Sequence, residues 1–497
     1  MKTRFCPSPT GNMHLGNART AIFNVLLSLG AKGTFLLRIE DTDSSRSTIE
    51  HTQTLLEDLF WLGCLSKEWQ EGPRVIEDVA GQLTYDDADG PKALYWQSKR
   101  GEIYKKYYDL LEQNRLAYPC FCSDYQLAIA RKIQMTAGKP PRYSGTCSRL
   151  THEQIAEKKS QGFIPTLRFR VPLDQTVEFD DLVRGKQSFD TNSIGDFIIR
   201  RGDGTSSFMF CNAIDDAVME VTHALRGEDH LTNTPRQLLI LRALNLPEPK
   251  YGHISLIVGN DGSPLSKRHG SRSIKELREE GFLPMAIVNY LARLGHTYPH
   301  QDENNQQSFL SLEELAHGFS THSMSNSPAR FDGPQLFYWQ KEAVNAASLS
   351  MLKMWLGEEI KSYVPDQKLN LFIETIRSNV LFPKDAVHWA KVLFLSSTIP
   401  FHEKAIHTLQ QAGESYFDAA LKIVDNFPQE SEIDYFKFIE VLQAQLNIKG
   451  KLLYQPLRTA LTGELHGPEL DKIFKIIGKK DVSYRLKQAK AIASQSI

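Results

Sequence analysis

The chain lacks a continuous apolar run long enough to cross a lipid bilayer, and no apolar signal-peptide core follows its first residues. It has six cysteines in 497 residues, too few and too unevenly spaced for the disulfide framework of a secreted protein. Its net charge of −1 excludes a protein that binds nucleic acid over its whole surface, so an RNA partner would have to meet local basic patches. We therefore expect a cytoplasmic protein without a membrane segment.

Two common phosphate-binding patterns are also missing near the start of the chain. Strands are predicted over residues 3–6 and 34–39, and the segment between them carries apolar side chains at helical spacing before Gly30. The turn from the first strand to this helix has neither the G-x-G-x-x-G spacing of dinucleotide sites nor the GK[ST] ending of a P-loop. Its place at the carboxyl end of a strand in a predicted parallel sheet nevertheless favours nucleotide binding.

Two segments far apart in the sequence supply what such a turn needs to hold phosphate. Residues 4–17 (RFCPSPTGNMHLGN) offer the amino-terminal N–H groups of the helix, a ring donor on His14, and close backbone approach at Gly16. Residues 265–270 (LSKRHG) add the cationic side chains of Lys267 and Arg268. We predict that these two segments form the two halves of one ATP site.

The two segments resemble the HIGH and KMSKS signatures of class I aminoacyl-tRNA synthetases, and the run PSPTG is similar to that of bacterial glutamyl-tRNA synthetases. Further blocks, in order along nearly the whole chain, resemble the same enzymes, which chance hardly ever produces. They are residues 37–43 (LRIEDTD), 179–185 (FDDLVRG), 225–230 (LRGEDH), 456–458 (PLR), 460–463 (ALTG) and 466–468 (HGP). Two positions depart from the family pattern, because Phe208 stands where tyrosine is common and Pro264 where the loop signature begins with lysine.

The resemblance implies an ATP-dependent ligase that activates L-glutamate as glutamyl-adenylate and transfers it to the 3′ end of tRNA-Glu, with Mg²⁺ accompanying ATP. Charging of tRNA-Gln, in addition or instead, stays open, and so does a catalytically silent tRNA-binding paralogue. A glutaminyl-tRNA synthetase fits less well, because its turn typically resembles PEPNG. The relative that glutamylates queuosine ends near the catalytic domain, whereas about 170 residues follow residue 327 here. We expect a monomer.

A glutamate pocket needs cationic forks for the side-chain carboxylate and an anion for the amine. By resemblance, Arg4 and Arg226 contact that carboxylate. Ser8 and Glu40 lie around the α-amino group in the family, and Phe208 belongs to the same pocket. The resemblance assigns catalysis to five residues of the two signatures: His14, Gly16, Ser266, Lys267 and Arg268. Three of them, His14, Gly16 and Lys267, also bind ATP in the family.

Three of the cysteines form a candidate site for one structural Zn²⁺. They are Cys120, Cys122 and Cys147, the last separated from the second by 24 residues. Some bacterial relatives carry a histidine where this chain has Arg149, which cannot bind the metal. The candidates for the fourth ligand are His152 and Tyr143; we prefer Tyr143, because it matches the tyrosine ligand of the queuosine-modifying relative. The alternative is a vestigial site whose cysteines stay reduced in a small core.

The resemblance implies an α/β fold in which a Rossmann-like parallel-sheet catalytic domain carries an inserted acceptor-binding module. A helical stem-contact domain and a C-terminal all-helical anticodon-binding domain follow. The sheet is expected to resume after the insertion at residues 196–201 and 216–226. The expected boundaries are 1–110 and 191–240 for the catalytic domain, 111–190 for the module, 241–327 for the stem-contact domain and 328–497 for the anticodon-binding domain.

Apolar faces at helical spacing predict helices over residues 416–427 and 438–446. The best candidate for an RNA contact is the basic segment 472–490, and the alternative is an ordinary solvated helix face. Its cations, set against Asp481, are Lys472, Lys475, Lys479, Lys480, Arg485, Lys487 and Lys490.

Overall fold

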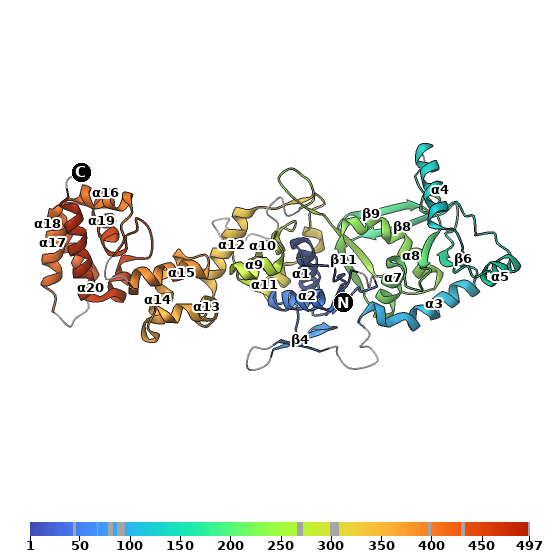
Figure 1. The fold of residues 1–497 in the computed structure, drawn as a ribbon, viewed down its shortest axis with the longest axis horizontal. Helices are drawn as coiled ribbons and strands as arrows, with labels where there is room; N and C mark the ends of the chain where they lie inside the picture. Colours follow the sequence, from blue (N-terminus) through green and yellow to red (C-terminus); the bar gives the residue numbers. More distant parts are fainter. Residues whose placement is uncertain are drawn as a thin grey trace. The chain divides into compact units, whose positions relative to one another are not determined.

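The computed structural model describes residues 1–42, 46–66, 68–77, 83–86, 95–138, 140–265, 272–298, 308–395, 399–428 and 433–495. The chain forms two compact units (Figure 1). The first comprises Met1–Glu279 and Ile287–Gly333, and the second comprises Glu280–Ala286 and Pro334–Ile497. Within the described parts of the chain, no helix is both long and apolar enough to cross a membrane.

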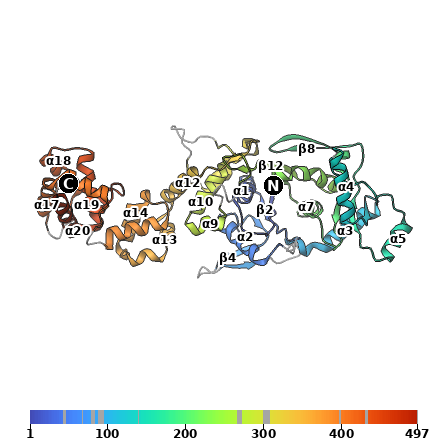
Figure 2. The ribbon, with the colours of Figure 1, turned by 45° about the horizontal axis from the view of Figure 1, so that its top comes forward.

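The first unit contains the parallel sheet that the sequence predicts. Strand β1 (Lys2–Phe5) pairs in parallel with β2 (Thr34–Leu37), which pairs in parallel with β3 (Gln70–Glu71). Helix α1 (Leu15–Gly30) connects β1 to β2 and packs against both strands (Figure 2). The predicted order of strand, turn, helix and strand is confirmed, and the turn follows the carboxyl end of β1.

A second parallel pair extends this arrangement. Strand β11 (His223–Gly227) pairs with β12 (Lys250–Ile254), so that Arg226 lies opposite His253. Strand β11 lies beside β1, and the Thr222 amide donates a hydrogen bond to the Lys2 carbonyl at 2.9 Å. A parallel strand thus lies beside β1 again at residues 223–227, at the end of the segment expected over 216–226, and belongs to a separate two-stranded sheet.

The insertion contains an antiparallel sheet of three strands in the order β10-β7-β6. They are β6 (Ala117–Cys120), β7 (Thr166–Phe169) and β10 (Phe197–Arg200). The expectation that residues 196–201 resume the parallel sheet is therefore wrong. Phe197 stacks on Phe169 with ring centroids 5.3 Å apart, and Asp196 accepts a hydrogen bond from the Val171 amide at 2.8 Å, so local contacts hold this strand in the insertion.

One apolar core joins the insertion to β11 and β12, and its side chains come mainly from the helices and strands around them. The other elements of residues 46–243 are α2 (Ile49–Trp61), β4 (Arg74–Glu77), β5 (Leu83–Asp86), α3 (Gly101–Gln113), α4 (Asp124–Thr136), α5 (His152–Ser160), β8 (Thr176–Asp181), β9 (Gly185–Asp190), α6 (Thr191–Ile194), α7 (Phe208–Val218) and α8 (Thr234–Ala243). Strands β8 and β9 form an antiparallel hairpin, as do β4 and β5.

Short elements follow β12, and helices make up the second unit. The short elements after β12 are β13 (Ile257–Val258), α9 (Ile274–Glu280), α10 (Pro284–Arg293), α11 (Leu312–Gly318) and β14 (Ala329–Arg330). The helices of the second unit are α12 (Gly333–Ala346), α13 (Leu349–Leu356), α14 (Asp366–Ile376), α15 (Pro383–Ala390), α16 (Glu403–Ala412), α17 (Glu414–Asp425), α18 (Tyr435–Leu446), α19 (Lys451–Thr462) and α20 (Leu470–Ala493). The helices predicted over 416–427 and 438–446 are α17 and α18, and α20 contains a non-helical residue at Gly478.

Candidate functional site

The amino-terminal turn meets a segment that lies about 260 residues later in the sequence. His14 precedes α1, its side chain is exposed, and no side chain caps the helix. The Ile274 amide donates to the Met13 carbonyl at 2.9 Å, and His14 forms an antiparallel bridge with Ser273. The chain therefore returns to the turn five residues after Arg268, the last of the predicted catalytic residues.

The residues just before the predicted catalytic segment, Pro264 and Leu265, are also held by backbone hydrogen bonds. The Leu265 amide donates to the Ile257 carbonyl at 3.0 Å, and Pro264 forms a bridge with Val258. Pro264 costs no donor there, because the hydrogen bonds of this bridge run from the Leu265 and Gly259 amides to the Ile257 and Ser263 carbonyls. Both flanks of the loop are thus fixed, while three predicted catalytic residues lie outside the described residues: Ser266, Lys267 and Arg268.

Gly16 lies in the first turn of α1 next to open space. A Cβ atom built on Gly16 would meet no other atom within 4 Å. The first turn of α1 contains no acidic side chain, so nothing there neutralises the positive end of the helix dipole. Open space beside unpaired N–H groups suits a phosphate, as the sequence predicts for this turn.

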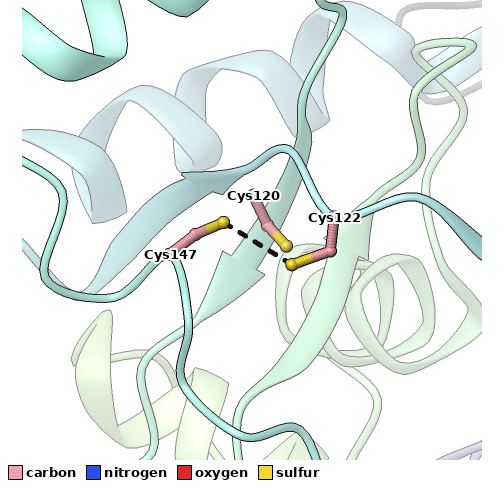
Figure 3. Close-up of side chains that lie close together, drawn as sticks. All are labelled: Cys120, Cys122 and Cys147. Atoms are coloured by element: carbon pink, nitrogen blue, oxygen red, sulfur yellow. Dashed lines mark hydrogen bonds between the residues drawn. The ribbon is translucent and has the colours of Figure 1, made fainter. Parts of the chain in front are cut away.

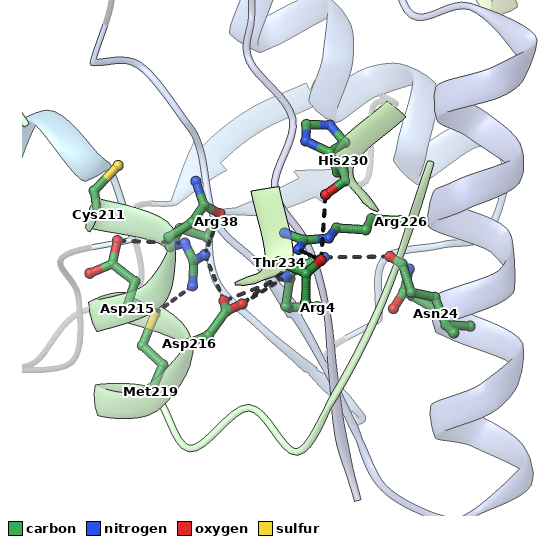
Figure 4. Close-up of polar contacts among 12 residues, drawn as sticks. Arg4, Asn24, Arg38, Cys211, Asp215, Asp216, Met219, Arg226, His230 and Thr234 are labelled. Carbon is green, nitrogen blue, oxygen red and sulfur yellow. Dashed lines mark hydrogen bonds and ion pairs between the residues drawn. The ribbon is translucent and has the colours of Figure 1, made fainter. Parts of the chain in front are cut away.

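Arg4 lies on β1 in a buried network of opposite charges (Figure 4). Its Nε and Nη2 atoms lie 3.4 Å from the carboxylate of Asp216, which also accepts a hydrogen bond from Arg38 Nη2 at 2.7 Å. Burial by itself would raise the pKa of Asp216, but attraction to Arg4 and Arg38 outweighs it and lowers that pKa. The charge of Arg4 is therefore already matched by a carboxylate of the protein.

Arg226 lies close by and is matched differently (Figure 4). It is 5% exposed; Nη2 donates to Thr234 Oγ1 at 2.6 Å and Nε donates to His253 Nε2 at 3.1 Å. Its Nη1 has no hydrogen-bond partner among the described residues, and none of their carboxylates forms an ion pair with it. Burial is the main reason why the pKa of Arg226 is lowered to about 10. A buried guanidinium with one unused donor suits an anionic ligand.

The structure places Glu40 near Arg4 and Phe208 beside His230 but does not bring Ser8 to them. Glu40 follows β2; burial raises its pKa to about 7, against the opposing effects of a hydrogen bond from Asn212 and of nearby arginines. Phe208 begins α7, and its ring lies 5.1 Å from that of His230, whose pKa falls to about 4 through burial and the charge of Arg226. Ser8 is exposed in the turn after β1. No contact among the described residues joins Ser8 directly to the others.

Sequence reasoning missed the groups that hold this pocket together. Asn212 and Asp216 lie four residues apart on α7, so both face the arginines. Asn212 Oδ1 accepts a hydrogen bond from Arg38 Nη2 at 3.0 Å. The pattern N-x-x-x-D on an apolar helix was the available signal, because two polar side chains on a buried face need partners.

The three predicted cysteine ligands converge at the end of β6 (Figure 3). Their sulfur atoms lie within 4.8 Å of one another, and Cys122 Sγ lies 3.6 Å from Cys147 Sγ. Tyr143 Oη lies 3.4 Å from both Cys120 Sγ and Cys122 Sγ and accepts a hydrogen bond from the Cys147 amide at 2.9 Å. The geometry therefore supports Tyr143 as the fourth ligand, while His152 is exposed at the start of α5 and is not part of this group.

The predicted basic segment forms α20, where several cations have partners within the protein. Arg485 is buried and donates to main-chain carbonyl oxygens of Leu461 and Val392. Lys479 donates to the Phe427 carbonyl. Lys490 pairs with Glu414 and Asp418, and Lys472 pairs with Glu469. The cations that stay exposed without an ion-pair partner among the described residues are Lys475, Lys480 and Lys487.

Comparison with known proteins gives a consistent result for both units. The model of the class I tRNA synthetase (E and Q) catalytic domain matches residues 1–337, and that of an anticodon binding domain matches residues 348–490. The chain is 54% identical to a glutamate–tRNA ligase of Coxiella burnetii over 98% of this chain and 99% of that one. It is 51% identical to a glutamate–tRNA ligase of Nitrosococcus oceani over 98% and 97% of the two chains. The solved glutamate tRNA ligase of Elizabethkingia meningosepticum, in complex with its amino acid, matches with a TM-score of 0.82 and 27% identity over 99% of each chain.

Proposed function

Because the chain belongs to the class I tRNA synthetases (E and Q), we propose that it is a glutamate–tRNA ligase that activates L-glutamate with MgATP and charges tRNA-Glu. The observation that carries this proposal is the buried guanidinium of Arg226, which keeps one donor unused beside Arg4. A free glutamate supplies the missing anion through its side-chain carboxylate, and its ammonium group finds the Glu40 carboxylate. The resemblance in sequence implies the same roles for these three residues.

The first chemical step needs no general base in the protein. The α-carboxylate of glutamate is ionised at neutral pH and attacks the α-phosphorus of ATP, which releases pyrophosphate and leaves glutamyl-adenylate. Catalysis then rests on alignment and on stabilisation of negative charge. We assign this work to the start of α1, with His14 and open space at Gly16, and to Ser266, Lys267 and Arg268 on the loop that returns beside His14. Mg²⁺ enters with ATP as part of the substrate.

In the second step, the terminal ribose hydroxyl of the tRNA attacks the mixed anhydride. In this proposal the phosphate of the adenylate takes the proton from this hydroxyl. A protonatable side chain whose substitution abolishes transfer but leaves adenylate formation intact would contradict this assignment.

The decisive experiment is ATP–pyrophosphate exchange with L-glutamate, followed by charging of purified tRNA-Glu and tRNA-Gln side by side. Exchange in the presence of tRNA-Glu supports the ligase, and no exchange with any glutamate-family tRNA would support a silent tRNA-binding paralogue. Charging of both tRNAs would identify a non-discriminating enzyme, which the departures at Phe208 and Pro264 do not decide. Phe208 lacks a hydroxyl that could serve substrate or water, an effect of about 1 kcal/mol.

The cysteine group fits one structural Zn²⁺, because four donor atoms of suitable chemistry converge there. Cys120, Cys122, Tyr143 and Cys147 would hold the ion, which would pin the start of the insertion. The Arg168 guanidinium lies 3.9 Å from the centre of the Tyr143 ring and packs a cation against its face. Elemental analysis of freshly prepared protein should find about one zinc per chain, and Tyr143→Phe should lower that content more than His152→Ala. Zinc far below this level in the unmodified protein would favour a vestigial site.

The domain plan is proposed on the same basis. The insertion, expected over residues 111–190 and extended in the structure by β10, would bind the acceptor end, residues 241–327 would contact the stem, and the helical second unit would read the anticodon, in line with the match of residues 348–490. We further propose a cytoplasmic monomer, which size-exclusion chromatography with light scattering and a fluorescent fusion in cells would test. A stable dimer or a membrane-associated signal would contradict this part.

A further inference from the structure

Behind Arg226, two buried side chains form a chain of hydrogen bonds that ends on its guanidinium. Asp181, the last residue of β8, lies with its Oδ2 atom 2.5 Å from His253 Nδ1, and His253 Nε2 accepts from Arg226 Nε at 3.1 Å. The side chains of Asp181 and His253 have no exposed surface. The position of His253 follows from the sheet, because it is the residue directly opposite Arg226 in the pairing of β11 with β12.

The contacts indicate where the proton of the neutral imidazole sits, and Thr234 Oγ1, 3.0 Å from His253 Nε2, can donate to the same nitrogen as Arg226. Arg226 Nε can only donate, so His253 Nε2 must accept, and the proton of the neutral ring must sit on Nδ1. Asp181 Oδ2 accepts that proton and thereby holds this tautomer and the ring orientation. The third contact of the guanidinium, from Nη2 to Thr234 Oγ1, leaves Nη1 as the donor without a partner.

We propose that Asp181 and His253 are positioning residues for glutamate recognition: they hold Arg226 so that Nη1 alone is left for the side-chain carboxylate of the substrate. This inference rests on the proposed function, because it assigns the anion to glutamate. It also gives a role to the block 179–185, which the ATP chemistry and the pocket residues do not use. Removal of either residue should change the use of glutamate and leave the use of ATP unchanged.

The carboxylate of Asp181 has two separable tasks, which makes a sharp test possible. Its Oδ1 atom accepts hydrogen bonds from the amides of Val183, Arg184 and His253 at 3.0, 2.9 and 3.1 Å and so shapes the turn after β8. Only Oδ2 meets the imidazole. Asp181→Asn can keep Oδ1 in the turn and place an NH₂ group against Nδ1. The ring would then adopt the other tautomer, whose Nε2–H opposes the Arg226 donor.

His253 offers a matched pair of substitutions. His253→Phe keeps a flat ring but has no acceptor, so Arg226 Nε loses its partner in a buried site. His253→Gln can place Oε1 near the former position of Nε2 and accept the same hydrogen bond. The control is Asp180→Asn, which removes the same charge one residue away, where the side chain is exposed.

The experiment measures KM for L-glutamate and for ATP by pyrophosphate exchange with tRNA-Glu present, together with the calorimetric Kd for L-glutamate. A lost hydrogen bond to a charged group should raise the glutamate KM of His253→Phe and Asp181→Asn about 10- to 100-fold, with the ATP KM within about twofold. The glutamate-to-glutamine ratio of kcat/KM should fall with it. His253→Gln should stay within about fivefold of the unmodified protein, and Asp180→Asn within about twofold.

Equal effects of His253→Phe and His253→Gln, or parallel changes in the KM of ATP and glutamate, would show a structural role and overturn the proposal. Unchanged glutamate KM and Kd in Asp181→Asn would do the same, even if both His253 variants fail to fold. Circular dichroism and the thermal midpoint identify misfolded variants. The proposed function is judged separately, by glutamate-dependent exchange in the unmodified protein. Without that exchange, the glutamate Kd values of the variants still decide the positioning role, and no binding in any of them would overturn it.

Discussion

Two regions of this molecule contain several cationic side chains, the predicted glutamate pocket and helix α20. The two sets differ in how their charges are paired within the protein. In the pocket, Arg4 is matched by Asp216, but Arg226 is buried with an unused donor. On α20, the one buried cation, Arg485, donates to main-chain oxygens, and Lys490 is paired with two carboxylates. The number of cations does not distinguish these regions. The surroundings do: Arg226 meets only a hydroxyl and an imidazole, keeps Nη1 without a partner among the described residues and lies beside a second buried arginine, Arg4, so it indicates a binding site for an anion.

The largest effect is expected where a matched pocket charge loses its partner. Asp216→Asn leaves Arg4 and Arg38 with less compensation in a buried site, and breaking such a pair costs about 3–5 kcal/mol of unfolding free energy. Urea denaturation followed by circular dichroism measures this loss. The control, Asp109→Asn, removes an exposed partner of Lys105 and should cost under about 0.5 kcal/mol. Equal losses in the two variants would contradict the matched network.

The next effect concerns the unmatched charge and falls on activity rather than stability. Arg226→Met removes a cation that the folded protein does not neutralise, so its loss should cost little stability, while kcat/KM for glutamate should fall at least about 100-fold, or roughly 2.7 kcal/mol. Pyrophosphate exchange at varied glutamate measures it. Arg242→Met is the control, because Arg242 is partly exposed and pairs with Glu248. An unchanged kcat/KM would remove Arg226 from the pocket.

The comparison also shows how far the sequence could predict the molecule. Strand, turn and helix at the amino terminus follow from apolar spacing and Gly30, and Arg4, Glu40 and Arg226 follow from resemblance. Residues 196–201 read as a strand correctly, but a strand does not encode which sheet it joins, because its partner is decided by contacts such as Phe197 on Phe169. Partners across long sequence distances, such as His253 for Arg226, escape local patterns for the same reason.

A third, smaller effect is the pH dependence of glutamate use. Burial raises the pKa of Glu40 to about 7, so a large part of this group is protonated near neutral pH. Only the ionised form attracts the substrate ammonium, so the glutamate KM should fall about three- to tenfold from pH 6 to pH 8. His230 does not titrate in this range, because burial and Arg226 lower its pKa to about 4. Glu40→Gln should flatten the profile, and a flat profile in the unmodified protein would contradict this role of Glu40.

The smallest effect concerns α20 and distinguishes its exposed lysines without ion-pair partners from Lys490, which is paired with two carboxylates. If exposed lysines without ion-pair partners meet tRNA phosphates, Lys475→Ala with Lys480→Ala should raise the tRNA KM about three- to tenfold at low salt and reduce the salt slope by about 1 to 2. Lys490→Ala should stay within about twofold, because Glu414 and Asp418 already engage that side chain. Titration of tRNA-Glu at several salt concentrations measures both. A larger effect of Lys490→Ala would mean that partners within the protein do not predict which cations RNA uses, and the contrast between the two regions would then hold for buried charges alone.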